Sequence, residues 1–466
     1  MTGFRSRLSQ LAYGFLLVPG AVAVLFAVLA LALVEIDRRM EELELGFGGD
    51  ADAARAVLAA IAGSIITVAG LAFSITIVTL QLVSSQYSPR ALRGFLRDRL
   101  NQLVAGVFVG TFAYCLLVLT TVRGGSDGGS GEFVPRISIA VAIALGVLAI
   151  PLLLVFIHHM SQSIQVSRIV ADIGRTGLDA VDRLYPERSG SAIDQRWERL
   201  VEEWTNSEQP ALVHADRAGF VQRIDLDMLL RSVTDRGSST RSQRHRLHLR
   251  VAPGDFVTPR TVLAARWPAD DAPLVKQAVL RAVRLGERRD MEQDAGYAVR
   301  QLVDVALRAI SPAMNDPTTA IDCIGYLQTI LEELGGRAFP PRIRHFADAD
   351  LTVVVDRRDF DDFVEEAFAE LGRYDRSDPR LALRLLAALE RTAEAVVAGG
   401  ARERLGVVIE TADAIGRAAI DQAPSEHDRG AIAEALERVR RTESSAGPRE
   451  EEELEPPGGR ESSPGG

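Results

Sequence analysis

The sequence is poor in cysteine and lysine. It contains two cysteines, Cys115 and Cys323, and one lysine, Lys276, among 53 basic residues. Two cysteines so far apart form neither a disulfide framework nor a metal-binding spacing. We therefore expect no metal site, and a reducing compartment suits the half of the chain that is not apolar.

Established catalytic signatures are also missing. The sequence has no P-loop, no G-x-G-x-x-G, no H-E-x-x-H, no nucleophile elbow and no kinase motifs, and its seven histidines form no ligand cluster. The net charge is −10, whereas nucleic-acid binders carry a basic footprint. We expect no cofactor and no nucleic-acid partner, and no reaction can be inferred from motifs.

Long apolar runs, in contrast, are abundant before His158. Four of them contain no Asp, Glu, Lys or Arg: about Leu11 to Val34, Val57 to Val83, Leu103 to Val122, and Ile137 to Ile157. A helix needs about 20 apolar residues to cross the bilayer core. The first run could also be a signal peptide, but it exceeds the roughly 7–15 apolar residues of such signals. We predict four transmembrane helices in contact with the lipid bilayer.

Arginines between the runs predict the orientation. The segment between the second and third runs carries Arg90, Arg93, Arg97 and Arg99, and the N-terminus carries Arg5 and Arg7. Positively charged loops stay on the cytoplasmic side of a membrane. We therefore expect both termini, and everything after His158, to be cytoplasmic.

The second run carries a stripe of small and polar residues near helical spacing. Its members are Gly63, Thr67, Gly70, Ser74 and Gln81, and the third run adds the pair Gly106 and Gly110. Small residues let membrane helices approach closely, so helix packing is one interpretation. The other is a polar, water-lined path along the second run.

The remaining chain divides by its patterning. We predict a four-span transmembrane domain (1–158), an amphipathic stalk helix and linker (159–210), a small β module (211–268), a mainly helical domain (269–442) and a disordered acidic tail (443–466). The fold class is thus an α-helical membrane domain followed by a cytoplasmic α+β region. The β module is spaced like the barrel-sandwich modules of biotinyl and lipoyl carriers, but it lacks the lysine that such carriers need. Residues 350–356 form a strand-like run within the helical part.

The stretch "AISPAMNDPTTA", residues 309–320, is the strongest candidate for a site. Pro312 ends one helix, while Asp316 and Pro317 suit the N-cap and first turn of the next. The whole motif can thus be a turn. A helix start also offers free N–H groups to an anion. The candidate ligand-binding residues are Arg300, Asp304, Arg308, Ser311, Asn315, Asp316, Thr318 and Thr319.

Several segments together resemble a known family. They are "TIVTLQLVSSQYSPRALRGFLRD", "FIHHMSQSIQVSR", "PGDFV" and "EQDAGYAVRQLVDVALRAISPAMNDPTTAID". The chain resembles, over about residues 10–420, the bacterial membrane-protein family known as domain of unknown function 2254. The resemblance implies a multi-span protein of the bacterial inner membrane with a cytoplasmic C-terminal region. It implies no catalytic residues.

Three functions are compatible with these features. The first is a homo-oligomeric channel or transport-type protein with a cytoplasmic regulatory region. The second is a membrane-anchored sensor or scaffold that binds a small anion or a partner protein. The third, an enzyme using Asp316 with Arg300, Asp304 or Arg308, is the least favoured, because no nucleophile and base pair by spacing.

Overall fold

The protein is described here by a computed structural model. It describes residues 17–40, 46–86, 98–124, 133–163, 165–186, 196–234, 245–267, 269, 272–346, 351–374 and 378–445. The chain divides into two compact units, Met1–Asp172 (unit 1) and Ile173–Gly466 (unit 2). Arg5, Arg7, Arg90, Arg93 and Arg97, which carry the predicted orientation, lie outside the described residues.

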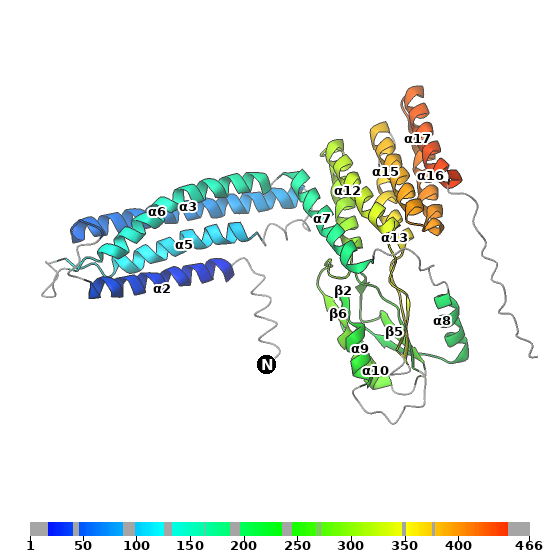
Figure 1. The fold of residues 1–466 in the computed structure, drawn as a ribbon, viewed down its shortest axis with the longest axis horizontal. Coiled ribbons are helices and arrows are strands. Elements are labelled where there is room, and N and C mark those ends of the chain that lie inside the picture. The colour runs from blue at the N-terminus through cyan, green and yellow to red at the C-terminus, as the bar shows by residue number, and fades with distance from the viewer. Residues whose placement is uncertain are drawn as a thin grey trace, which may run out of the picture. The chain divides into compact units, whose positions relative to one another are not determined.

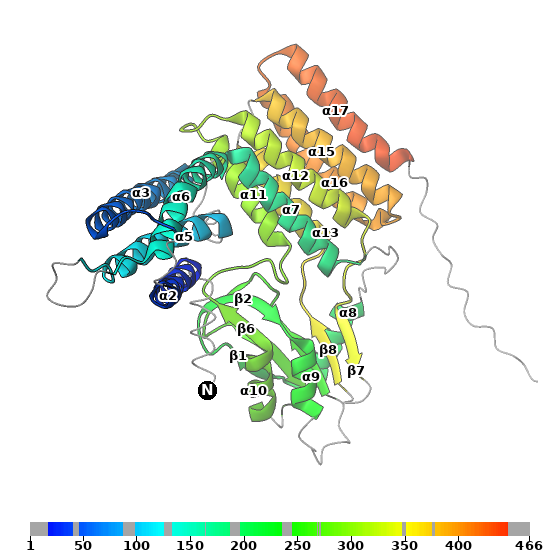
Figure 2. The same ribbon diagram turned by 60° about the vertical axis from the view of Figure 1, so that its left-hand side comes forward.

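Unit 1 is a bundle of four apolar helices that lie side by side (Figures 1 and 2). They are α2 (Leu17–Arg39), α3 (Ala51–Gln86), α5 (Arg99–Leu119) and α6 (Arg136–Ser163). All four are long and apolar enough to cross a membrane. The four apolar helices predicted from the sequence are therefore present; the first six residues of the first run lie outside the described part.

Helices α2 and α5 approach each other closely because α5 carries two glycines. A Cβ added at Gly106 would lie 2.9 Å from the Val22 Cβ, and one at Gly110 would lie 2.6 Å from the Phe26 ring. Both distances are too short for a side chain, so the α2 side chains occupy the space that the glycines leave. This pair packs helices within one chain.

The described residues of unit 2 form two sheets. The strands are β1 (Ala211–His214), β2 (Gly219–Ile224), β3 (His245–Leu249), β4 (Phe256–Val257), β5 (Val262–Trp267), β6 (Val283–Gly286), β7 (Ile343–Phe346) and β8 (Leu351–Val355). Their orders are β1-β5-β3-β8-β7 and β4-β2-β6, and only β3 and β8 pair in parallel. Strands β6, β7 and β8 lie beyond residue 268, so later parts of the chain complete both sheets. The strand-like run at 350–356 is β8.

The helices of unit 2 surround the sheets and stack beside them (Figure 2). They are α7 (Val166–Leu184, which starts in unit 1), α8 (Arg196–Ser207), α9 (Leu226–Thr234), α10 (Ala272–Ala282), α11 (Gly296–Ala309), α12 (Pro317–Gly335), α13 (Phe360–Val364), the π-helix η2 (Glu365–Ala369), α14 (Leu371–Tyr374), α15 (Pro379–Ala398), the short 3₁₀ helix η3 (Arg402–Arg404), α16 (Leu405–Gln422) and α17 (Glu426–Ser445). Helix α17 continues three residues into the expected tail, and the rest of that tail lies outside the described residues.

The second half of α7 packs against α11 and α12. Gly177 faces α11, because a Cβ there would lie 2.7 Å from the Ala298 Cβ, and Gly174 lies against the Tyr326 ring. The Arg337 guanidinium contacts the Asp182 carboxylate (2.5 Å) and donates to the Tyr185 carbonyl (3.0 Å). These contacts fix the C-terminal end of α7 within unit 2.

Candidate functional site

The predicted joint between two helices is present at residues 309–320. Helix α11 ends at Ala309, and α12 begins at Pro317 with Asp316 as its N-cap. Asn315 has a φ of 47°, the left-handed conformation that asparagine tolerates better than most residues. The local sequence therefore determines this turn as the capping rules predict.

Polar groups of the turn are bonded mainly to one another. The Thr319 N–H and Oγ1 donate to the Asp316 carboxylate (3.1 and 2.6 Å). The Ser311 hydroxyl donates to the Arg308 carbonyl (2.6 Å). Asn315 and Thr318 are exposed. The turn thus brings together Ser311, Asn315, Asp316, Thr318 and Thr319, and its capping carboxylate is already occupied.

The candidate residues Arg300, Asp304 and Arg308 follow one another along α11, and the first of them makes its contacts away from the turn. Arg300 donates to Asp304 (2.7 Å) and to Glu370 at the end of η2 (2.6 Å). Nine residues separate Arg300 from the end of α11, which is roughly 13 Å along a helix. The structure therefore separates Arg300 from the turn and pairs it with η2, whereas Arg308 lies in the last turn of α11 beside the motif.

The small-residue stripe of α3 faces outward from the four-helix bundle. Its members Gly63, Thr67, Gly70, Ser74 and Gln81 are all exposed. No atom lies within 4 Å of a Cβ placed at Gly63 or Gly70. The stripe therefore differs from the glycine pair of α5, because no described residue of this chain packs on its glycines.

A cavity of about 320 Å³ lies in unit 2 where several segments end. Its lining comes from residues 183–185, 223–227, 252–253, 293–295, 340, 344, 355, 357–358 and 363. These are the end of α7, the end of β2 with the start of α9, the turn before β4, the segment before α11, and the region around β7 and β8. The cavity is at the small end of the volumes that ligand pockets have.

Five arginines line this cavity: Arg183, Arg223, Arg344, Arg357 and Arg358. Three have partners inside the protein. These contacts are Arg223 with Asp225 and Glu292 (3.4 and 3.1 Å), Arg358 with Glu366, and Arg183 with the Met291 carbonyl (2.8 Å). The guanidiniums of these three residues are thus wholly or partly engaged.

Arg344 and Arg357 are different. Within the described part of the chain, no carboxylate contacts either guanidinium, and the Arg357 Nε is shielded from solvent without a hydrogen-bond partner. Three nearby carboxylates are engaged with other groups: Asp356 with His248 (2.8 Å), Asp359 with Arg342 (3.2 Å) and Asp294 with Arg289 (2.8 Å). The exposed Asp227 also lines the cavity and makes no ion pair with either arginine. The cavity therefore holds positive charge that those neighbours do not neutralise.

The surroundings of the cavity shift the pKa values of two lining residues, Arg357 and Asp294. Burial lowers the pKa of Arg357, and the neighbouring guanidiniums of Arg344 and Arg342 lower it further. Burial raises the pKa of the Asp294 carboxyl, against the opposing effect of Arg289 and Arg358. An unpaired charge that loses water costs free energy until an opposite charge arrives. An anion in the cavity would supply that opposite charge.

Two helix starts border the cavity, and a carboxylate already occupies the first of them. Residues 225–227 include the start of α9, where Met228 N–H donates to the Asp225 carboxylate (2.9 Å). Residues 293–295 precede α11, whose N-cap Ala295 supplies no side-chain acceptor. Helix starts carry partial positive charge and point N–H groups outward. At α9 the Asp225 and Asp227 carboxylates offset this charge, so only the α11 start, which has no side-chain cap, can supplement the arginines.

Sequence patterns alone did not single out this cavity. Two segments that carried the family resemblance, "PGDFV" and "EQDAG", meet there: Gly254 has a φ of 101°, and a Cβ added to it would lie 2.4 Å from the Asp294 carboxylate. A further signal was available in "DRRDF", residues 356–360, where two arginines directly follow the predicted strand. What the sequence could not show is which arginines lack partners.

Comparisons with known proteins place the chain in a family of membrane proteins. The model of the family described as "Predicted membrane protein (DUF2254)" matches residues 13–391. An uncharacterized protein of Mycobacterium bovis and uncharacterized proteins of two Mycobacterium tuberculosis strains are each 34% identical to it over 419 residues, covering 87% of this chain and 76% of theirs. No solved structure matches. The chain therefore belongs to the DUF2254 family, as its motifs indicated.

Proposed function

We propose that this protein is a membrane-anchored receptor for a small anion. The observation that carries the proposal is the pair Arg344 and Arg357, which line a cavity without a carboxylate partner among the described residues. Two uncompensated guanidiniums destabilise the empty protein, and an anion relieves that cost on binding. A protein that binds an anion can retain two such guanidiniums because the bound anion compensates their charge.

The division of the chain supports an anchored receptor. Unit 1 has four helices that can cross a membrane, and the cavity lies in unit 2. Helix α7 follows α6 in the chain after two residues, and its last residues, Arg183 and Leu184, line the cavity. The proposed receptor sits in the bacterial inner membrane with unit 2 in the cytoplasm. Ligand binding would then act on the helix that leads directly to the fourth apolar helix.

The test is thermal unfolding of the full-length protein in detergent. All three tryptophans, Trp197, Trp204 and Trp267, lie in unit 2, so their fluorescence reports its unfolding. Sodium phosphate is compared with sodium chloride at equal ionic strength. Phosphate stabilises many proteins through exclusion from their surface. The informative quantity is therefore a difference: the rise in Tm that phosphate causes in the wild type, minus the rise that it causes in Arg357→Gln.

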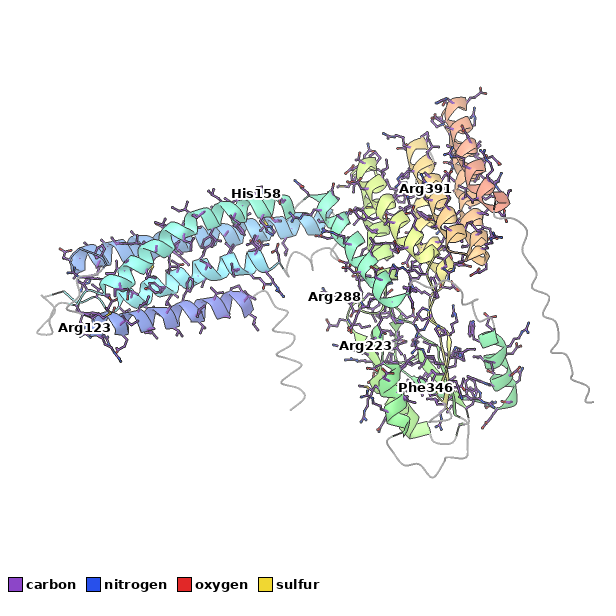
Figure 3. The ribbon with its side chains drawn as sticks, viewed as in Figure 1. Arg123, His158, Arg223, Arg288, Phe346 and Arg391 are labelled. Carbon is purple, nitrogen blue, oxygen red and sulfur yellow. The ribbon has the colours of Figure 1, made fainter. Side chains whose placement is uncertain are left out.

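We expect a clear rise in Tm for the wild type, because a ligand at 100 times its Kd adds about 2.7 kcal/mol of stability. Arg357→Gln should lose this increment. The control Arg391→Gln alters an exposed arginine on the helical side of unit 2 (Figure 3) and should keep it. Equal responses of the wild type and Arg357→Gln to phosphate, sulfate and acetate would refute the receptor.

A second candidate, a homo-oligomeric channel or transport-type protein, is favoured by the outward stripe of α3. Gly63 and Gly70 leave room for a helix of another copy to approach, with Thr67 between them. Leucine at both glycines should then break the oligomer, whereas Gly20→Leu on the exposed face of α2 should not. A monomeric wild type, or liposomes whose ion flux equals that of empty vesicles, would exclude this function.

A further inference from the structure

The charge of the cavity limits what the anion can be. Arg344 and Arg357 are two guanidiniums without carboxylate partners in the described chain, and Arg183 donates to the backbone carbonyls of Met291 and Glu292. A ligand with a single negative charge would leave at least one of them uncompensated. A doubly charged group with several acceptor oxygens satisfies both, and guanidinium forks match the oxygens of phosphate.

The arginines approach the cavity from neighbouring strands. Arg344 lies on β7, where it stands opposite Val353 of β8, and Arg357 follows the end of β8. Because β7 and β8 are hydrogen-bonded neighbours, the sheet fixes the backbone positions of the two arginines relative to each other. The start of α11, where no side chain caps the helix, borders the cavity and is the kind of element that binds phosphate oxygens, whereas the α9 start is already capped by Asp225.

The cavity is larger than a phosphate group requires. Its volume of about 320 Å³ corresponds to roughly ten water molecules in the liquid. Part of the wall is apolar: Leu226, Val355 and Phe363 are buried there. The Tyr185 ring packs edge-on against Phe363 with centroids 6.0 Å apart. This wall suits a small organic group attached to the phosphate.

We infer that the ligand is a phosphate monoester, whose phosphoryl group binds Arg344 and Arg357 while a small apolar remainder lies against Tyr185 and Phe363. This inference rests on the proposed anion receptor and narrows its ligand. The same chemistry occurs in soluble organic phosphates and in a lipid headgroup such as that of phosphatidic acid. Both carry a charge between about −1.5 and −2 at pH 7.

The experiment compares two probes of one shape on the full-length protein in nanodiscs of phosphatidylcholine. Phenyl phosphate is a dianion above its second pKa of about 6, whereas phenyl sulfate is a monoanion at every working pH. Affinities are measured by calorimetry at pH 7.5 and pH 5. We expect phenyl phosphate to bind about tenfold or more tightly than phenyl sulfate at pH 7.5, with a much smaller ratio at pH 5.

Variants separate the site from general charge effects. Arg357→Gln and Arg344→Gln should each bring the ratio of affinities close to one, whereas Arg391→Gln should leave it unchanged. Two variants are used so that poor folding of one does not decide the result. Nanodiscs with phosphatidic acid provide the lipid arm. If phosphatidic acid competes with phenyl phosphate, and this competition depends on Arg357, the ligand is a lipid phosphate. If phosphatidic acid does not compete while phenyl phosphate still binds, the ligand is a soluble phosphate.

The possible failures are distinguishable. Equal binding of the two probes, lost in Arg357→Gln, would overturn the phosphate monoester and leave the anion receptor standing. No binding of phenyl phosphate, phenyl sulfate or inorganic phosphate to the wild type would overturn both.

Discussion

In two regions of unit 2, an arginine side chain makes no ion pair with a carboxylate among the described residues. The two regions differ in the hydrogen-bond acceptors that they offer the guanidinium. At the end of α12, Arg404 donates from Nη1 to three backbone carbonyls, those of Leu334, Gly335 and Arg337 (3.0, 3.1 and 2.9 Å). Its guanidinium also lies over the rings of Phe339 and Phe360 (4.6 and 5.5 Å to their centroids). Carbonyls at a helix end carry partial negative charge, so the Arg404 Nη1 and these carbonyls satisfy one another. The Arg404 Nε, like that of Arg357, is buried without a hydrogen-bond partner among the described residues.

In the cavity, Arg357 has no comparable contacts. Burial lowers the pKa of both Arg404 and Arg357, so desolvation does not separate their roles. What separates them is the hydrogen bonding: the Arg404 Nη1 makes three bonds, whereas no bond holds the Arg357 guanidinium among the described residues. A buried arginine with acceptors belongs to the fold, and one without them is available to a ligand.

The largest expected effect is at Arg404. Arg404→Met leaves the Gly335 and Arg337 carbonyls without this donor, whereas the Leu334 carbonyl still accepts from the Arg337 N–H (3.2 Å). We expect the free energy of unfolding to fall by about 3–5 kcal/mol, since each buried unsatisfied group costs about 1–3 kcal/mol. Thermal unfolding followed by tryptophan fluorescence measures this. The neighbouring Arg402→Met, at an exposed position, is the control and should change little. A stable Arg404→Met protein would remove the contrast between the two arginines.

An opposite and smaller effect is expected at Arg357. Arg357→Met removes an uncompensated charge and keeps an apolar stem in the half-buried position. We expect the ligand-free protein to gain about 1–2 kcal/mol, at the low end of the gain found when buried charges are replaced by apolar groups. The same unfolding assay, without phosphate or sulfate, measures it. A loss of stability comparable to that of Arg404→Met would mean that Arg357 is a structural residue.

The smallest effect is expected in the turn at 309–320. Asp316→Ala removes the cap that accepts from the Thr319 N–H and hydroxyl. We expect a loss of about 1 kcal/mol, typical of an N-cap, with the response of Tm to phosphate retained. Thr318→Ala, at an exposed position of the same turn, should be nearly neutral. If Asp316→Ala abolished the phosphate response instead, the turn would be the binding site and the comparison would reverse.

Features that depend on neighbours in the chain were predictable. Four apolar runs predicted four helices, because the length needed to cross a membrane is a property of a continuous segment. Pro312, Asp316 and Pro317 predicted the joint between α11 and α12, because capping acts over three or four residues. The stripe of α3 was visible as a pattern. Its outward direction was not, because that depends on which faces the other helices cover.

The sequence by itself therefore determined the apolar helices, the turn at 309–320, strand β8 and membership of a membrane-protein family. Only the tertiary structure decided where charge is left uncompensated. The cavity gathers residues from Arg183 to Phe363, and Asp356 is occupied by His248, which lies 108 positions away. Whether an arginine has a partner depends on such long-range contacts, and no local pattern records them.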